Sequence, residues 1–397
     1  MPLTITWWRI PGASSLPCLG VAQPSLPQWG NVIISWMSPK VIRHALLAVI
    51  LSGCVRPEGG PAVRVVRLPA GGDVPSVAVD ASGRLHAVYA RGNDTWYAVS
   101  ADGGARWGPP ELVSGPGGTA DEPGMFRGPT LAIGKNGYVH AVWYPLRRDR
   151  PEAEWGPRYS RRDPATEKWG SAVVITPGLA EGLSVAASPY GRVIVGWAGD
   201  TGLFIARSTD DGTTFGAPEA VAGTDPVRSC VTRALFLPGG EFLLLYRDRA
   251  TRARCESVVV WPPTGGTPTV RTLSTKPWPE DACPTTGGWL SAGAGVAVAA
   301  WETGDEVSWA FIDSTGTITE PSEVPTAAMA GRWPVAIANA GGYACVSWKE
   351  SNFLKWQVFE PGGRPTGPPK SAISSGTNGH AGAVLPDGTF VLVDAGK

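Results

Sequence analysis

The chain has 397 residues, and its 34 lysine and arginine residues are balanced by 34 aspartate and glutamate residues. This balance, without any basic run, argues against a nucleic-acid-binding surface. Glycine occurs 52 times and proline 38 times, so the chain is divided into short strands and turns rather than long helices.

Two segments precede the globular part of the chain. Residues 1–36 hold a single charged side chain and resemble no targeting segment, so we interpret them as an over-extended start, with Met37 as the initiator. Residues 37–53 begin with Lys40 and Arg43 and continue into an apolar run. That run is shorter than the roughly 20 residues of a membrane-spanning helix. A basic start followed by a short apolar run is typical of a secretory signal peptide.

The signal peptide ends in Leu51-Ser52-Gly53-Cys54, which resembles a bacterial lipobox. The resemblance implies that the chain is cleaved before Cys54, that Cys54 carries a lipid, and that residues 54–61 link this anchor to the folded domain. It also implies export to the bacterial cell envelope, anchored in the outer membrane or at the cell surface. The sequence leaves open which membrane or leaflet holds the lipid.

A repeated strand motif fills the rest of the chain. Seven times a glycine is followed at alternate positions by apolar residues; six copies end in an aromatic, and the seventh, Gly388 to Asp394, does not. Successive glycines are 54, 54, 49, 55, 47 and 46 residues apart. A period of this size, built from short strands, indicates a propeller or a solenoid. The six copies with an aromatic begin at Gly83, Gly137, Gly191, Gly240, Gly295 and Gly342.

Each repeat has the features of one propeller blade. The glycine permits a tight turn, the residues after it alternate like a strand, and another apolar run, such as Pro75–Val79, precedes it. We therefore predict an all-β fold in which residues 62–397 form a single seven-bladed β-propeller, with six blades as the alternative. The last repeat stops after its second strand, whereas residues 62–69 read as an unassigned strand. We predict that this strand joins the C-terminal blade and closes the ring.

A second motif, Ser-x-Asp-x-Gly-x-x-aromatic, occurs twice. In both copies the serine lies 17 residues after the glycine of its repeat. The aspartate can accept backbone N–H bonds in a turn, the glycine can adopt the left-handed conformation, and the aromatic ring can pack between blades. We therefore predict a structural role for both copies. Their residues are Ser100, Asp102, Gly104 and Trp107 in the first, and Ser208, Asp210, Gly212 and Phe215 in the second.

This motif resembles the Asp-box, or BNR repeat, of sialidase-type propellers. The resemblance implies that the boxes lie away from the ligand-binding face, which is the face where first strands begin and second strands end. In sialidases three arginines hold the carboxylate of sialic acid, an aspartate is the general acid, and a Tyr–Glu pair supplies the nucleophile. Arginine suits the first task because a guanidinium group pairs with a carboxylate through two hydrogen bonds.

Two segments resemble parts of the sialidase site. Phe126-Arg127-Gly128-Pro129 resembles the segment that carries the first arginine, and the segment ending in Tyr246-Arg247-Asp248-Arg249 resembles one that delivers another. Arg127, Arg247 and Arg249 are therefore the predicted ligand-binding residues. Asp149 and Glu302 are weaker candidates for a general acid or base. The catalytic residues stay unassigned, because no credible Tyr–Glu pair is found.

Two classes of function remain. We favour a non-catalytic, lipid-anchored propeller that binds a glycan or a surface protein through this face, with an anionic or hydroxyl-rich ligand matching the arginines. The alternative is a sialidase-like glycoside hydrolase that uses Asp149 or Glu302 as acid or base. A purely structural role in the envelope is a third possibility. We expect a monomer without cofactor or metal, since no corresponding motif is present.

The cysteines after the anchor raise the question of disulfides, because exported proteins can form them. We predict a disulfide among Cys230, Cys255 and Cys283, with the pair left open. Cys345 lies inside a second strand and is expected to be a small buried side chain.

Histidines and aromatics that recur at equivalent positions are expected to pack rather than bind ligands. His86 and His140 occupy the same position in their repeats. The aromatics at the ends of second strands recur in six repeats, as packing between blades requires. They are Tyr89, Trp143, Trp197, Tyr246, Trp301 and Trp348.

Overall fold

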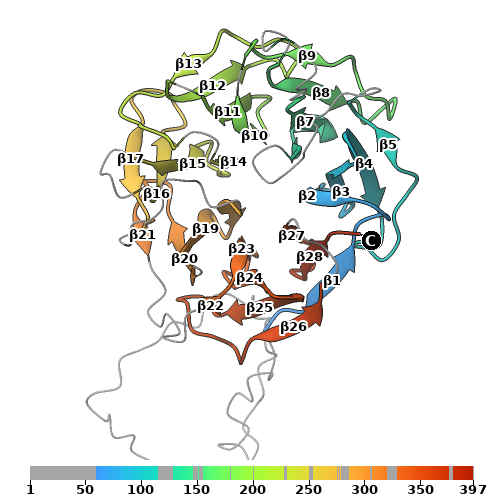
Figure 1. Cartoon of the computed structure of the whole chain (residues 1–397), viewed down its shortest axis with the longest axis vertical. Coiled ribbons are helices and arrows are strands. Elements are labelled where there is room, and N and C mark those ends of the chain that lie inside the picture. The colour runs from blue at the N-terminus through green and yellow to red at the C-terminus, as the bar shows by residue number, and fades with distance from the viewer. Residues whose placement is uncertain are drawn as a thin grey trace, which may run out of the picture. The chain divides into compact units, whose positions relative to one another are not determined.

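A computed structural model describes residues 60–114, 128–145, 151, 155–178, 180–199, 201–227, 230–249, 254–274, 276, 278, 286–304, 306–319, 329–374 and 379–396. These residues form 28 strands and one short 3₁₀ turn, η1 (Lys135–Gly137). The strands make seven sheets arranged in a ring (Figure 1). The predicted seven-bladed β-propeller is confirmed, and the six-bladed alternative is wrong.

Six blades are antiparallel sheets whose four strands follow one another from the axis outward. Blades 1 to 3 consist of β2 (Asp73–Val79), β3 (Leu85–Arg91), β4 (Asp94–Ser100) and β5 (Glu111–Leu112); β6 (Thr130–Ile133), β7 (Val139–Trp143), β8 (Arg158–Arg162) and β9 (Val173–Val174); and β10 (Glu181–Ala187), β11 (Val193–Ala198), β12 (Leu203–Ser208) and β13 (Glu219–Ala220). Blades 4 to 6 consist of β14 (Arg233–Phe236), β15 (Phe242–Asp248), β16 (Cys255–Trp261) and β17 (Thr269–Thr272); β18 (Trp289–Gly293), β19 (Val296–Thr303), β20 (Glu306–Ile312) and β21 (Ile318–Thr319); and β23 (Arg332–Ala338), β24 (Ala344–Glu350), β25 (Phe353–Phe359) and β26 (Lys370–Ile373). The short strand β22 (Met329–Ala330) also pairs with β20.

The strand-end aromatics pack between blades, as the repeat predicted. Each is at most 3% exposed and belongs to a hydrophobic cluster shared by two neighbouring blades. Tyr246, for example, contacts the cluster that joins Leu203 of blade 3 to Val259 of blade 4. The core is therefore divided among the seven interfaces between blades. Both faces of each second strand are buried, because every blade is covered by a neighbouring blade on each side.

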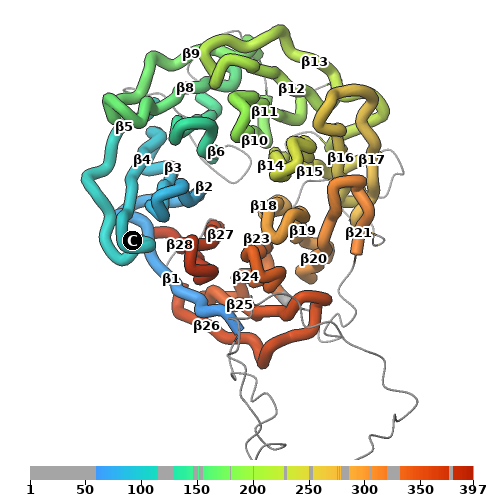
Figure 2. Tube along the Cα trace, turned by 180° about the vertical axis from the view of Figure 1, so that it is seen from behind, coloured from blue at the N-terminus to red at the C-terminus, as the bar shows by residue number. Residues whose placement is uncertain are grey.

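Blade 7 has three strands and joins the two ends of the propeller chain. β27 (His380–Val384) pairs with β28 (Phe390–Asp394), and β28 pairs with β1 (Val63–Arg67). The predicted closure is therefore confirmed, and Figure 2 shows β1 beside β28. β1 takes the third position of its blade and runs parallel to β28. β28 ends at the same end of the ring at which β2 begins. Because only a few residues separate β1 from β2, β1 must also end there, which makes it parallel to β28.

The two equivalent histidines lie in the core and bond the same partner position. His86 Nδ1 is 2.7 Å from the hydroxyl of Tyr97, and His140 Nδ1 is 2.7 Å from the hydroxyl of Tyr159. Both tyrosines lie in the third strand of their blade. Burial lowers the pKa of His140 to about 4, with a smaller contribution from Arg161. Packing and internal hydrogen bonding thus account for these side chains.

The low pKa of His140 predicts acid sensitivity. The unfolded chain holds this histidine near its ordinary pKa of about 6.5 and so binds one more proton than the folded state below that pH. The contribution of His140 is complete above pH 6.5 and is lost at roughly 1.4 kcal/mol per pH unit down to about pH 4. Denaturant unfolding at pH 7, 6, 5 and 4.5 should show a shallower loss of stability in His140→Gln. Identical slopes for the variant and the parent protein would contradict the assignment.

Candidate functional site at the top face

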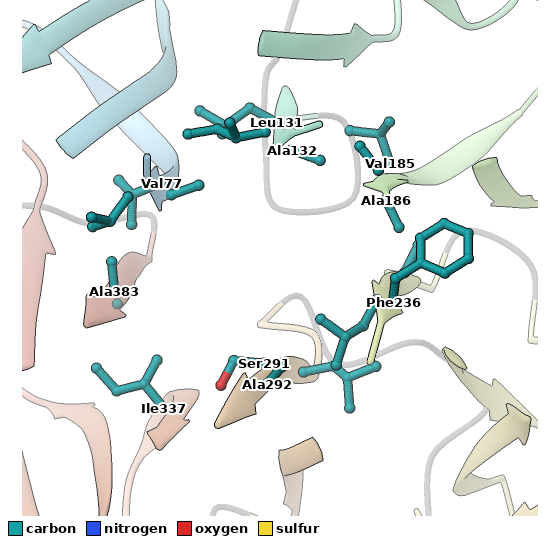
Figure 3. Close-up of a pocket in the computed structure, with 18 of the residues that line it drawn as sticks. Val77, Leu131, Ala132, Val185, Ala186, Phe236, Ser291, Ala292, Ile337 and Ala383 are labelled. Atoms are coloured by element: carbon teal, nitrogen blue, oxygen red, sulfur yellow. The ribbon is translucent and has the colours of Figure 1, made fainter. Parts of the chain in front are cut away.

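The end of the propeller where first strands begin and second strands end is here called the top face. Below it runs a central cavity of about 450 Å³, lined by the first strands of all seven blades. Figure 3 shows apolar side chains such as Val77, Leu131 and Ile337 around this space. Among the lining side chains only Ser291 and Trp289 carry a polar atom, and the Ser291 hydroxyl donates to the carbonyl of Ala336 at 2.9 Å. The wall offers no charge, so a polar ligand would have to be bound at the rim.

Three apolar side chains meet over the axis at the top face. Val74, Val231 and Trp333 form one small cluster, with Val74 and Val231 buried and Trp333 half-buried. They come from blades 1, 4 and 6, which are not neighbours, so their contact spans the centre of the ring. The cluster lies above the central channel, at the top end of the first strands.

Backbone irregularities bring two members of the cluster inward. β2 and β23 each shift register near their start, between Asp73 and Ser76 and between Arg332 and Val335. Inside these bulges Val74 and Trp333 have φ of 48° and 63°, values that are rare for side chains of this kind. Strained backbone of this sort often accompanies functional sites. Neither residue was predicted from the sequence, because both read as ordinary strand residues.

Charged side chains surround this centre at one repeated position. Arg247, Glu302 and Lys349 each follow the strand-end aromatic in blades 4, 5 and 6. Arg247 Nη2 lies 3.0 Å from Glu256 Oε2, and the two side chains are 3% and 2% exposed. The same nitrogen donates to the carbonyl of Glu302 at 3.0 Å and so ties blade 4 to blade 5.

Glu256 is the acidic partner that the sequence analysis missed. It faces Arg247 across the β15–β16 ladder. Burial raises the pKa of its carboxyl group, while Arg247 and Arg233 act in the opposite direction. The signal was present, because Glu256 is the only charged residue in the strand Cys255–Trp261, and a buried acid needs a partner. We predicted that Arg247 binds a ligand. Its guanidinium group instead forms an ion pair with Glu256 inside the protein.

Ion pairs also join blade 5 to blade 6 and blade 6 to blade 7. Glu302 is fully buried; its carboxylate accepts a hydrogen bond from the Thr286 hydroxyl and lies 3.3 Å from Nε of Arg332. The Arg332 side chain is 50% exposed, so this pair holds an arginine at the surface beside Trp333. Lys349 Nζ lies 2.9 Å from Asp394 Oδ1, and both side chains are buried. Glu302, a candidate acid or base, is thus enclosed and paired with a cation.

Of the remaining predicted residues of the top face, the structure describes Arg249. It is half-exposed and lies 2.7 Å from Asp225 on the blade 3–4 connection. Arg127 and Asp149 lie outside the described residues. Of the three predicted arginines, the structure therefore places Arg247 inside the protein and Arg249 at the surface.

One tyrosine does lie next to a carboxylate on this face. The Tyr246 hydroxyl donates to Asp248 Oδ2 at 2.8 Å. Tyr246 is nevertheless buried in the cluster between blades 3 and 4, and burial together with Asp248 raises the pKa of its phenol. A raised pKa disfavours the phenolate, so this pair does not have the electrostatics of an activated nucleophile.

The Asp-box residues form two outer turns on the opposite face. Ser100 and Ser208 donate to Asp102 and Asp210 at 2.8 and 2.7 Å. The aspartates accept the backbone N–H groups of Arg106 and Thr214 at 2.8 and 2.9 Å. The glycines Gly104 and Gly212 have φ of 92° and 75°. The aromatics reach a neighbouring blade: Trp107 Nε1 donates to the carbonyl of Arg67 at 2.7 Å, and Phe215 packs edge-on against Tyr159 at 4.7 Å.

The structure tests part of the disulfide prediction. Cys230 is disulfide-bonded, whereas the described cysteines Cys255 and Cys345 are thiols. The pairs that involve Cys255 are therefore wrong. Of the predicted partners this leaves Cys283, which lies outside the described residues, as does Cys54. Cys345 is buried, and burial raises the pKa of its thiol, in keeping with a packing role.

In the part of the chain that the structure describes, no group of three or more His, Cys, Asp or Glu side chains is arranged to hold a metal ion. None of the helical segments described there is long and apolar enough to cross a membrane.

No protein-family model and no curated protein matches this sequence. Among solved structures, the chain is similar to an ulvan lyase, a polysaccharide lyase, with 12% identity, a TM-score of 0.47, and coverage of 82% of this chain and 86% of that one. A Hadza microbial sialidase has 16% identity, a TM-score of 0.47, and coverage of 71% and 64%. An α-L-arabinofuranosidase from Fusarium graminearum has 13% identity, a TM-score of 0.46, and coverage of 80% and 98%.

Proposed function

We propose that this protein is a lipid-anchored, non-catalytic β-propeller that binds an anionic or hydroxyl-rich glycan, or a surface protein that carries one, through its top face. The observation that carries the proposal is the pair formed by Trp333 and Arg332 near the axis. Trp333 is half-buried in a strained conformation, and half of the Arg332 side chain is exposed. An aromatic face suits the apolar side of a sugar ring, and a guanidinium group suits a carboxylate.

The electrostatics of the top face support binding over hydrolysis. A glycosidase needs an accessible carboxylic acid with a raised pKa, close to a second carboxylate. Burial raises the pKa of the Glu256 carboxyl group, but this group is enclosed against Arg247. Glu302 and Asp394 are also buried against cations. These acids stabilise the contacts between blades and position Arg332. The exposed arginines are therefore the groups proposed to bind the ligand.

A binding experiment tests this proposal. Immobilised oligosaccharides that end in sialic acid or in a uronic acid should bind the purified chain, and Trp333→Ala, Arg127→Ala and Arg249→Ala should each weaken binding by roughly tenfold, the effect of losing one charged or aromatic contact. Tyr190→Ala is the matched control, because Tyr190 is an aromatic side chain that is 65% exposed at a turn on the opposite face. Equal binding by all four variants, with unchanged melting temperatures, would refute the proposed site.

The hydrolase alternative depends on the Tyr246–Asp248 hydrogen bond and on Asp149. It predicts turnover of a fluorogenic sialoside that disappears in Tyr246→Phe and in Asp149→Ala. We expect no such turnover, because the Tyr246 phenol is buried and its pKa is raised. Turnover that depends on either residue would replace the binding proposal with a sialidase-like mechanism.

The lipid anchor is a separate part of the proposal. The lipobox-like Leu51–Cys54 supports it, and Cys54 precedes Gly60 by only six residues, a reach of about 20 Å when extended. Cys54→Ala should release the protein from the membrane fraction or leave the precursor uncleaved, while Cys18→Ala should change neither. Normal processing and membrane retention of Cys54→Ala would exclude the anchor.

A further inference from the structure

Blade 7 lacks the outer strand that every other blade has. In blades 1 to 6 a fourth strand covers the third one, whereas β1 is the outermost described strand of its sheet. Four of these fourth strands, β5, β9, β13 and β21, are only two residues long. Pairing over two or three residues is therefore enough to complete a blade in this fold. The outer edge of β1 offers that length.

The backbone groups on this edge can be assigned from the ladder with β28. The carbonyl of Ala62 accepts the N–H of Phe390, and the N–H of Leu68 donates to the carbonyl of Asp394, both at 2.9 Å. In a parallel ladder, alternate residues bond to one neighbour, so Val63, Val65 and Arg67 direct their N–H and C=O groups outward. Among the described residues, these groups have one hydrogen-bond partner, Trp107, which donates to the carbonyl of Arg67. Val63 and Val65 thus leave an open sheet edge.

The edge of β1 lies between two neighbouring blades. On one side Arg64 Nη1 donates to the carbonyl of Asp102 in the Asp-box turn of blade 1. On the other side Arg67 Nη2 reaches the carbonyl of Ile373 in β26 of blade 6 at 3.4 Å, and Figure 2 shows β1 running beside β26. A cavity of about 190 Å³, lined by Val63, Trp356 and Lys370 among others, adjoins the edge on the blade 6 side.

Positively charged side chains border the edge. Since neighbouring strands lie about 4.8 Å apart, a single extended segment added to β1 would occupy the place that the fourth strand takes in the other blades. Arg64, Arg67 and Lys370 are exposed around it, and Asp102 is already paired with Arg106 at 3.0 Å.

We infer that the outer edge of β1 is a docking site for an extended acidic segment of a partner protein, which adds the missing fourth strand to blade 7. The backbone of Val63 and Val65 supplies the hydrogen bonds of the added strand. Arg64, Arg67 and Lys370 supply the preference for acidic side chains, and the cavity beside Trp356 accepts one side chain of the segment. This surface is separate from the top face and does not depend on the proposed function.

A peptide experiment tests the inference without altering the protein. The probe is a fluorescein-labelled nine-residue peptide of alternating glutamate and valine, titrated with the full chain and followed by fluorescence anisotropy. Two derivatives carry the same number of N-methyl groups, placed on alternate residues so that each blocks one edge of the peptide strand. Blocking the edge that pairs with β1 should weaken binding by at least about tenfold, since several hydrogen bonds are lost, while blocking the other edge should not.

Protein variants and a reversed peptide complete the test. Val65→Pro removes an outward N–H group and Arg67→Glu reverses a charge that borders the edge; each should weaken binding of the unmodified peptide, and a lysine–valine peptide should not bind. Equal affinity of the two methylated peptides, or no binding of the acidic peptide, would overturn the inference. Protection of the Val65 amide from hydrogen exchange in the peptide-free protein would overturn it as well, since the edge would then be occupied by this chain or a second copy.

Discussion

Replacing Arg247 by alanine should destabilise the protein by roughly 3–5 kcal/mol, because it leaves the buried Glu256 carboxylate without its closest cation. The two groups are 3.0 Å apart, and both side chains are almost fully enclosed. The change also removes the hydrogen bond to the Glu302 carbonyl that joins blades 4 and 5. Denaturant unfolding at neutral pH would measure the loss. The result distinguishes a residue that holds the propeller together from one that binds a ligand.

The control is Arg249→Ala, two residues further along the chain. Arg249 also pairs with an aspartate, but both side chains of that pair are about half-exposed, and exposed ion pairs contribute little. A loss below about 1 kcal/mol is therefore expected for this variant. The double variant Arg247→Met/Glu256→Leu should be more stable than Arg247→Ala, because it removes both charges. Equal stabilities of Arg247→Ala and Arg249→Ala would show that the buried pair has no structural role.

A chain that begins at Pro69 should lose cooperative unfolding, because it lacks β1. Without this strand, β28 becomes an open edge, and the buried side chains of Val66 and Leu68 no longer close the interface between blades 7 and 1. Each such side chain stabilises the fold by roughly 1.5–3 kcal/mol, and the ladder of five residue pairs is lost as well. The total is comparable to the whole stability of a typical domain, about 5–15 kcal/mol. Thermal unfolding followed by circular dichroism would report the change.

A chain that begins at Gly59 provides the control, since it keeps β1 and the entire compact unit Gly59–Lys397. It should melt at the same temperature as the full chain. Addition of a synthetic peptide of residues 61–69 to the chain that begins at Pro69 should restore a cooperative transition. If the shorter chain unfolds like the full one, closure by β1 contributes nothing to stability.

The sequence by itself determined the blades, their number and the strand that closes the ring. These features depend on local chemistry: a glycine at each inner turn, alternation along each second strand, and an aromatic that must be buried at its end. Gly83 and Gly388 adopt nearly the same positive φ, 84° and 85°, although they lie near opposite ends of the propeller's sequence. The seventh repeat keeps this glycine but ends in Asp394 instead of an aromatic, and the structure pairs that carboxylate with Lys349.

Tertiary structure alone decided what the top face presents. Val74, Val231 and Trp333 are far apart along the chain, and they meet only because the ring brings blades 1, 4 and 6 around one axis. Glu256 became the partner of Arg247 through the register of β15 and β16, which a repeat pattern does not specify. The direction of β1 likewise follows from where β2 must begin. Periodicity in a sequence reports what each residue does within its own strand, whereas contacts across the axis and between strands depend on ring closure and register, which involve the whole chain at once.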